Sequence, residues 1–141
     1  IFALLIGIDI YADAGIWNLS GCVSDCKRLE TFLVGRMEVP ERYICSLHNK
    51  AATRDAILTG FSNHLLDNRD ITVGDVMIIF FMGHGSRVPA PEGWAPLSSN
   101  VETIQPHDEG MQKDGALIHG IPDRTIVVLM AQLACRKGDN I

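Results

Sequence analysis

Aromatic residues, cysteines and long apolar segments are all scarce in this chain of 141 residues. Phenylalanine, tryptophan and tyrosine together make up only 6% of it. The longest apolar runs, residues 1–8 and 76–82, are far shorter than the roughly 20 residues that a membrane-spanning helix needs. The sequence therefore predicts no membrane span.

Basic residues form no cluster. The chain has 12 Lys and Arg against 17 Asp and Glu, a net charge of −5, so we expect no nucleic-acid partner and, for a charged ligand, a cationic one. Hydrophobic residues reach 47% and charged residues 21%, which is ordinary for a globular protein and excludes disorder. This length has room for one domain with a core and not for two.

The four cysteines are Cys22, Cys26, Cys45 and Cys135. They form no CxxC pair and are too few for a secreted disulfide scaffold, so we expect a reducing, cytoplasmic location. Residue 1 is Ile1 and opens directly into an apolar run, so we expect an N-terminal part to be missing.

Strands and helices are predicted to alternate along the first half. Residues 2–10 read as a strand that is covered on both faces, and residues 43–47 and 76–82 as two further strands. A helix that Ser24 caps should end at Gly35, and Thr53 should cap a second helix. The apolar stripe of the first helix contains Cys22, Cys26, Leu29, Phe32 and Leu33. This order predicts an α/β fold with a mostly parallel sheet and helices on its faces.

The second half is less regular. Residues 86–100 hold three of the six prolines and are predicted to form a surface loop. Residues 101–104 and 116–118 could pair as a hairpin. A third helix should start near residue 122 or 123 and end at Gly138, with an apolar stripe of Ile126, Leu129, Met130 and Leu133. Residues 139–141 are predicted to begin a fourth strand.

His84 is the best candidate for chemistry. It stands between two glycines directly after the strand 76–82, at the edge of a parallel sheet where ligands bind. An imidazole there can serve as a general base, although a turn histidine with a purely structural role is an equal alternative.

Asp25 starts the first helix at the same edge. It could bind a Lys or Arg side chain, but spacing alone favours stabilisation of its own helix dipole.

The cysteines are weaker candidates. Cys22 and Cys26 share one helical face, but no histidine lies at a zinc-like spacing, so buried packing is favoured over a metal site. Cys135 falls opposite the apolar stripe of the third helix and should face solvent, so we do not expect it to be a nucleophile. Motifs for a serine nucleophile elbow, a phosphate loop, a dinucleotide site and an EF-hand are all absent, which leaves a histidine base without its nucleophile.

The motifs taken together resemble the large-subunit portion of a caspase-like domain, most closely the metacaspase type of peptidase C14 that is abundant in fungi. The matching strings follow the order of the family: FALLIGI with Tyr11, LSGCVSDC, ATRDAI, FFMGHGS, VPAPEGW, PHDEG, GIPDR and KGDNI. The resemblance covers essentially all of residues 1–141, and it implies a three-layer caspase-like sandwich, incomplete in this chain.

The family resemblance implies a Cys-His dyad that cleaves peptides after Arg or Lys. His84 would assist the cysteine thiolate, and the Gly85 amide would face the developing oxyanion. Asp25 would line the pocket for the basic side chain, Ser86 would lie beside it, and Cys22 matches a second cysteine near the site. The implied partners are a peptide or protein substrate and the small-subunit portion of the same protein.

The chain also departs from the family pattern. The family nucleophile follows soon after KGDNI, beyond Ile141, so we expect no peptidase activity from residues 1–141 alone. Without the next strand, the strand 76–82 would have an open edge, so we also expect this fragment to be aggregation-prone. Met82, Ser24 and Gln105 replace the usual residues at their positions. Of the acidic pair that binds calcium in some relatives only Asp123 is present, so no metal or other cofactor is expected. A non-catalytic, caspase-like regulatory or binding domain is the alternative function.

Overall fold

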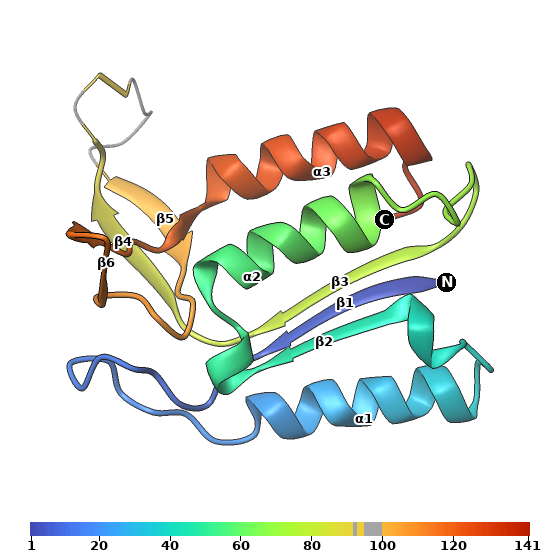
Figure 1. The fold of residues 1–141 in the computed structure, drawn as a ribbon, viewed down its shortest axis with the longest axis horizontal. Coiled ribbons are helices and arrows are strands. Elements are labelled where there is room, and N and C mark those ends of the chain that lie inside the picture. The colour runs from blue at the N-terminus through green and yellow to red at the C-terminus, as the bar shows by residue number, and fades with distance from the viewer. Residues whose placement is uncertain (92, 95–99) are drawn as a thin grey trace.

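A parallel three-stranded sheet forms the centre of the molecule (Figure 1). The computed structural model describes residues 1–91, 93, 94 and 100–141. The sheet has the order β2-β1-β3, with the strands β1 (Phe2–Gly7), β2 (Ile44–His48) and β3 (Met77–Met82). Gly7 at the end of β1 lies opposite His48 and Met82, so the three strands finish at one common edge. The predicted parallel sheet is confirmed, although β1 ends at Gly7, earlier than expected.

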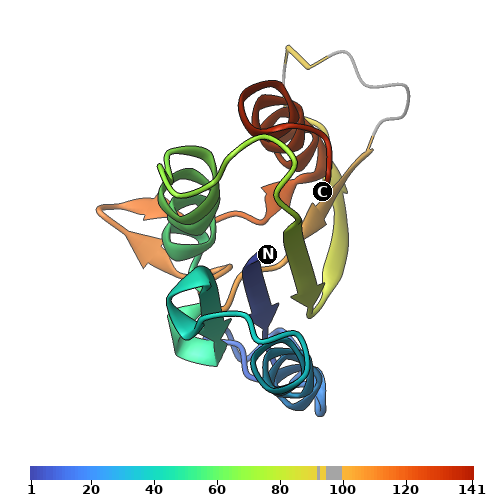
Figure 2. The ribbon, with the colours of Figure 1, turned by 90° about the vertical axis from the view of Figure 1, so that its right-hand side faces the viewer.

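Helices cover both faces of this sheet (Figure 2). The helix α1 (Cys22–Gly35) packs on the face of Ala3 and Leu5. The other face is covered by α2 (Arg54–Thr59), its π-helical continuation Gly60–Leu66, and α3 (Asp123–Lys137). All six residues of β1 are buried, and this two-sided burial explains why β1 reads as an uninterrupted apolar run. No helix in the described part of the chain has the length and apolar character to cross a membrane.

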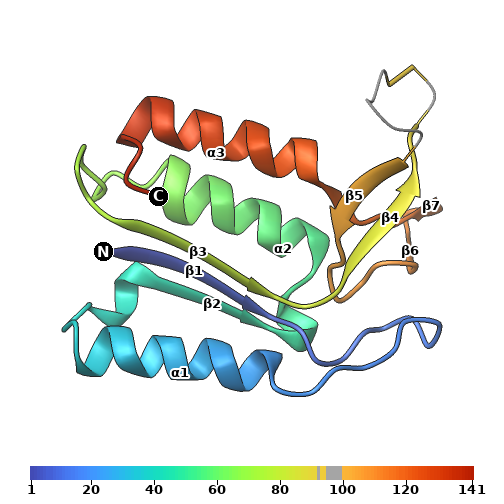
Figure 3. The same cartoon turned by 180° about the vertical axis from the view of Figure 1, so that it is seen from behind.

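A second, antiparallel sheet extends beyond the end of β3 (Figure 3). It contains β4 (Gly85–Pro89), β5 (Asn100–Ile104) and β8 (Ile121–Pro122), while β6 (Gln112–Lys113) and β7 (Ala116–Leu117) form a separate small hairpin. The predicted loop over residues 86–100 is therefore wrong for residues 86–89 in β4 and residue 100 in β5, and residues 92 and 95–99 of it lie outside the described residues. The predicted pairing of 101–104 with 116–118 is also wrong, because β5 pairs with β4 and β8. Pro89 is tolerated because β4 is an edge strand.

The start of α1 differs from the prediction for a specific reason. Gly21 occupies the N-cap position with a φ of 103°, and no side chain of the helix caps it. The carboxylate of Asp9 accepts hydrogen bonds from the amides of Cys22 (2.8 Å) and Val23 (3.2 Å) instead. Ser24 is therefore not the cap. An acid at the end of the central strand stabilises the free amides of the helix from outside.

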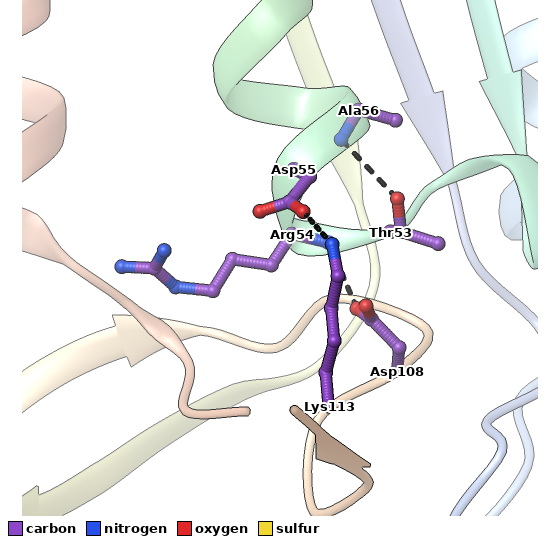
Figure 4. Close-up of polar contacts among 6 residues, drawn as sticks. All are labelled: Thr53, Arg54, Asp55, Ala56, Asp108 and Lys113. Atoms are coloured by element: carbon purple, nitrogen blue, oxygen red, sulfur yellow. Dashed lines mark hydrogen bonds and ion pairs between the residues drawn. The ribbon is translucent and has the colours of Figure 1, made fainter. Parts of the chain in front are cut away.

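The start of α2 is held by three contacts, which Figure 4 shows. The Thr53 hydroxyl caps the helix as predicted, at 3.2 Å. The Asp108 carboxylate accepts a hydrogen bond from the Arg54 amide at 2.8 Å, and Lys113 of β6 pairs with Asp55. Two of these contacts thus hold Asp108 and Lys113 against the N-terminal end of α2.

The predicted stripes of the two long helices are mostly confirmed. On α1, Cys22, Cys26 and Leu33 are buried, but Phe32 is half-exposed, contrary to the prediction. On α3, Leu133 is buried, and Ile126, Leu129 and Met130 pack against the same core.

The last residues of the chain lie beside β3. The Met77 amide donates a hydrogen bond to the carbonyl of Asn140 at 2.9 Å, although residues 139–141 form no regular strand. Within the described residues β3 pairs with β1 alone, so its other edge is open next to Ile78 and Phe80.

Candidate active site

His84 connects the two sheets, between the end of β3 and the start of β4. Its backbone amide donates a hydrogen bond to the Tyr11 hydroxyl at 2.7 Å, and its carbonyl accepts one from the Gln105 amide at 2.9 Å. A Cβ atom at Gly83 would come within 2.8 Å of the Phe81 ring and 3.1 Å of the Tyr11 hydroxyl, so this turn needs glycine. The backbone of His84 is therefore fixed on both sides.

The imidazole of His84 is fixed as well. Its Nε2 lies 2.8 Å from the carbonyl oxygen of Trp17, in the loop between β1 and α1. A carbonyl only accepts hydrogen bonds, so Nε2 must carry the hydrogen. Nδ1 is then the basic nitrogen of the neutral ring, and the half-exposed imidazole is oriented as a general base.

The side chain of Tyr11 is buried beside His84. The residue is 6% exposed, and its ring lies 5.2 Å from the His84 ring, centroid to centroid. Burial raises the pKa of the Tyr11 phenol, against the lowering effect of the hydrogen bond from the His84 amide. The phenol therefore stays protonated near neutral pH.

We expect Tyr11→Phe to lower the free energy of unfolding by about 1–2 kcal/mol, because the His84 amide loses its acceptor in a partly buried site. Urea denaturation measures the loss. Tyr43→Phe is the matched control, since within the described residues the hydrogen bond of the Tyr43 hydroxyl is to the exposed Arg42 guanidinium and its loss should change stability little. Equal losses in the two variants would contradict the role given to the Tyr11 hydroxyl.

Asp25 lies in the first turn of α1. The start of α1 lies at the edge of the sheet where β1, β2 and β3 end (Figure 1). Asp25 is half-exposed, and its carboxylate lies 3.6 Å from Nη1 of Arg28, one turn along the helix. The Asp25 carboxylate can therefore hold a guanidinium group at this edge while it also stabilises the helix N-terminus.

Cys22 and Cys26 are buried beneath this turn, as predicted. Burial raises the pKa of the Cys22 thiol, and a hydrogen bond to the Asp9 carboxylate raises it further. Burial also raises the pKa of Cys26, to about 11. Neither thiol is activated as a nucleophile in this arrangement. Across the described residues, no group of three or more His, Cys, Asp and Glu side chains is arranged to hold a metal ion.

Cys135 is exposed near the end of α3, as expected from its position on the helix. Gly138, the C-cap residue that follows α3, lies against Gly74, just before β3 begins. Cys135 is therefore near the amino ends of the parallel strands, whereas His84 is at their carboxyl ends.

Gly85 and Ser86 follow His84 along β4. Gly85 is exposed and pairs with Ile104, and Ser86 pairs with Thr103. An open depression of about 440 Å³ lies over this hairpin, with Gly85 and Ser86 in its wall. The predicted site residues thus fall into two groups, with His84, Gly85 and Ser86 on the β3-β4 side and Asp25 and Cys22 on α1.

Three contributors to the site escaped the sequence analysis. Asp9 holds the start of α1, Tyr11 holds the His84 amide, and the Trp17 carbonyl holds the imidazole. One general signal pointed to them: they follow the central strand, at the edge of a parallel sheet where ligands bind.

Asp123, the residue that matches one of the acidic pair in calcium-binding relatives, lies in the first turn of α3. Its carboxylate is exposed and accepts a hydrogen bond from the Arg124 amide at 2.6 Å. Calcium takes six to eight oxygen ligands, and among the described residues Asp123 belongs to no cluster of three or more acidic, His or Cys side chains.

Comparison with known proteins finds a matching protein family, a similar sequence and a similar fold. Residues 2–135 match the family model of the metacaspase, peptidase C14 domain. Metacaspase-6 of Arabidopsis thaliana is 32% identical over 144 aligned residues, which cover 99% of this chain and 38% of that protein. A crystal structure of a Geobacter sulfurreducens protein has the same fold, with a TM-score of 0.65 at 21% identity, over 94% of this chain and 44% of that one. The chain therefore spans less than half the length of each.

Proposed function

Because this chain belongs to the metacaspase, peptidase C14 family, we propose that it forms the histidine-bearing portion of a cysteine endopeptidase that cleaves after Arg or Lys. One observation carries the proposal. His84 Nε2 is held by the Trp17 carbonyl, so that Nδ1 is free to exchange protons at the carboxyl edge of the sheet.

In the proposed reaction, Nδ1 of His84 takes the proton of a cysteine thiol, and the thiolate attacks the substrate carbonyl. The Gly85 amide would face the oxyanion that develops on that carbonyl. The protonated imidazole then returns its proton to the leaving amine, and water hydrolyses the acyl-enzyme. A Cys-His reaction of this kind requires no cofactor.

We place the nucleophile on a strand that continues beyond Ile141. The bond from the Met77 amide to the Asn140 carbonyl supports this, because a chain that continues beside β3 in the parallel direction reaches the edge where His84 lies. On this proposal residues 1–141 alone turn over no peptide, since Cys22 is buried with a raised pKa and Cys135 lies at the far edge.

Specificity for a basic residue is assigned to Asp25, with Ser86 and Cys22 beside the pocket. The contact between Asp25 and Arg28 supports the assignment, since it places a guanidinium against this carboxylate. The substrates would be peptides or proteins with Arg or Lys before the cut. All four cysteines are free, which fits the cytoplasm as the proposed location.

The test measures cleavage of internally quenched peptides by the full-length protein, with Arg, Lys, Gln or Asp before the cut. We expect cleavage after Arg and Lys. Asp25→Asn should lower kcat/KM for these substrates on the order of 100-fold, because a desolvated cation would lose its counter-charge. Asp67→Asn is the matched control, because Asp67 pairs with Arg136 at the far edge and should change nothing.

The outcomes separate the alternatives. Equal cleavage after Gln and Arg would contradict the role of Asp25. A full-length protein that cleaves none of the peptides would overturn the proposal and favour a caspase-like binding or regulatory domain.

A further inference from the structure

The loop between β1 and α1 is held in one shape by its own polar groups. The Asp13 carboxylate accepts a hydrogen bond from the Gly15 amide at 2.8 Å, and the Asn18 side chain accepts one from the Tyr11 amide at 3.1 Å. The Leu19 amide donates to the carbonyl of Asp9 at 2.7 Å and closes the loop. These hydrogen bonds hold the backbone of the loop that includes Trp17 in one conformation.

Trp17 combines two opposite features on this loop. Its carbonyl oxygen accepts the hydrogen bond of the His84 imidazole, whereas the residue as a whole is 86% exposed, the highest value among the large apolar residues in the described part. The loop surrounds an open depression of about 530 Å³, with Ile16 and Trp17 in its wall. An indole in water at a fixed position gains free energy when an apolar group covers it.

The position of the proton-donating atom of His84 determines which part of a substrate lies near this indole. Nε2 of His84 is bound to the Trp17 carbonyl, so the leaving amine must receive its proton from Nδ1. The residue that follows the cut therefore leaves the site over the imidazole and its supporting loop. The carbonyl of the cleaved bond faces the Gly85 amide, and the side chain before the cut is the one assigned to Asp25 of α1.

We propose that the Trp17 indole forms a subsite for an apolar or aromatic side chain directly after the cleaved bond. This inference rests on the proposed peptidase function and assigns a second specificity determinant, which would contact the residue after the cut, whereas Asp25 would contact the residue before it. Asp13 in the same wall accepts a hydrogen bond from the Gly15 amide, and the apolar part of the wall includes Ile16 beside Trp17.

The test uses internally quenched peptides with Arg before the cut and Phe, Leu, Gly or Asp after it, cleaved by the full-length protein. We expect kcat/KM to be about tenfold higher for Phe and Leu than for Gly. Trp17→Ala should reduce this ratio to about twofold or less, and Trp17→Phe should keep most of it.

Two readouts separate this role from a structural one. The substitution leaves the backbone carbonyl in place, so the pH profile and the preference for Arg before the cut should be unchanged in Trp17→Ala. Phe32→Ala is the matched control, because it removes a half-exposed aromatic ring near the other end of α1 and should leave the ratio unchanged. A wild-type protein indifferent to the residue after the cut, or a ratio that survives Trp17→Ala, would overturn the inference.

A binding measurement keeps the inference testable if no peptide is cleaved. Trp17 and Trp94 are the two tryptophans of residues 1–141, so Trp94→Phe, with Trp→Phe replacements at any tryptophan in the rest of the full-length protein, leaves Trp17 as the single indole reporter. A peptide with Arg-Phe should shift the Trp17 emission to shorter wavelength, and one with Arg-Gly should not. Such a shift without cleavage would refute the proposed function yet support the subsite, whereas no shift and no cleavage would refute both.

Discussion

His84→Ala is expected to lower kcat/KM of the full-length protein by a factor of about 10⁴, measured on peptides with Arg before the cut. The variant removes the only group that the structure orients for proton transfer at this edge among the described residues. The stability of the fold should change little, because the imidazole is half-exposed and its single described hydrogen bond is to a loop carbonyl. Thermal unfolding of the variant checks this second expectation.

Two further variants sharpen the His84 experiment. His84→Gln keeps a side-chain amide that can donate to the Trp17 carbonyl but has no basic nitrogen, so it should be as inactive as the alanine variant. His119→Ala removes an exposed histidine from the segment before β8 and should leave activity unchanged. If His84→Ala retained more than a tenth of the activity, another group would have to be the base.

Gly7→Ala is expected to lower the free energy of unfolding by about 3 kcal/mol. A Cβ atom at this position would come within 2.8 Å of Cys26 Sγ and 2.9 Å of the Cys22 carbonyl oxygen. The thiol could rotate away, but the carbonyl belongs to the first turn of α1, so the helix must move off the sheet. Denaturation in urea measures the loss.

Gly35→Ala is the matched control for this prediction. Gly35 is the last residue of α1, and a Cβ there would meet no atom within 4 Å. Alanine is also the better helix former, so this variant should be as stable as the parent or about 0.5 kcal/mol more stable. Equal stabilities for Gly7→Ala and Gly35→Ala would show that α1 can shift without cost.

The sheet and its helices could be predicted because their signals are local. An apolar run such as residues 2–7 and a Thr53 cap depend on neighbouring residues, and both are confirmed. The start of α1 could not be predicted, because its stabilising group is Asp9, thirteen residues earlier. The strand β4 was missed because Pro89, the prolines that follow it and its short length are typical of a loop, and its pairing with β5 is a tertiary contact.

The candidate site, like the fold, could be predicted from the sequence only in part. The flanking glycines and the preceding strand pointed to His84, and the structure orients its ring. The group that orients it, the Trp17 carbonyl, is separated from His84 by 67 residues and carries no side-chain signal at all. The roles of Asp25, Ser86, Gly85 and Cys22 come from the family resemblance and stay predictions until the variants are measured.

The hydroxyl of Tyr11 lies 73 residues from the His84 amide that it binds. Contacts of such sequence separation form only after the intervening chain has closed its loops, which costs conformational entropy and delays them during folding. β1 and β3 must be paired before this bond and the Trp17 contact can exist together. A nascent chain, or one that has lost its sheet in the cell, thus holds no oriented imidazole, and whatever chemistry the site performs is confined to completely folded molecules.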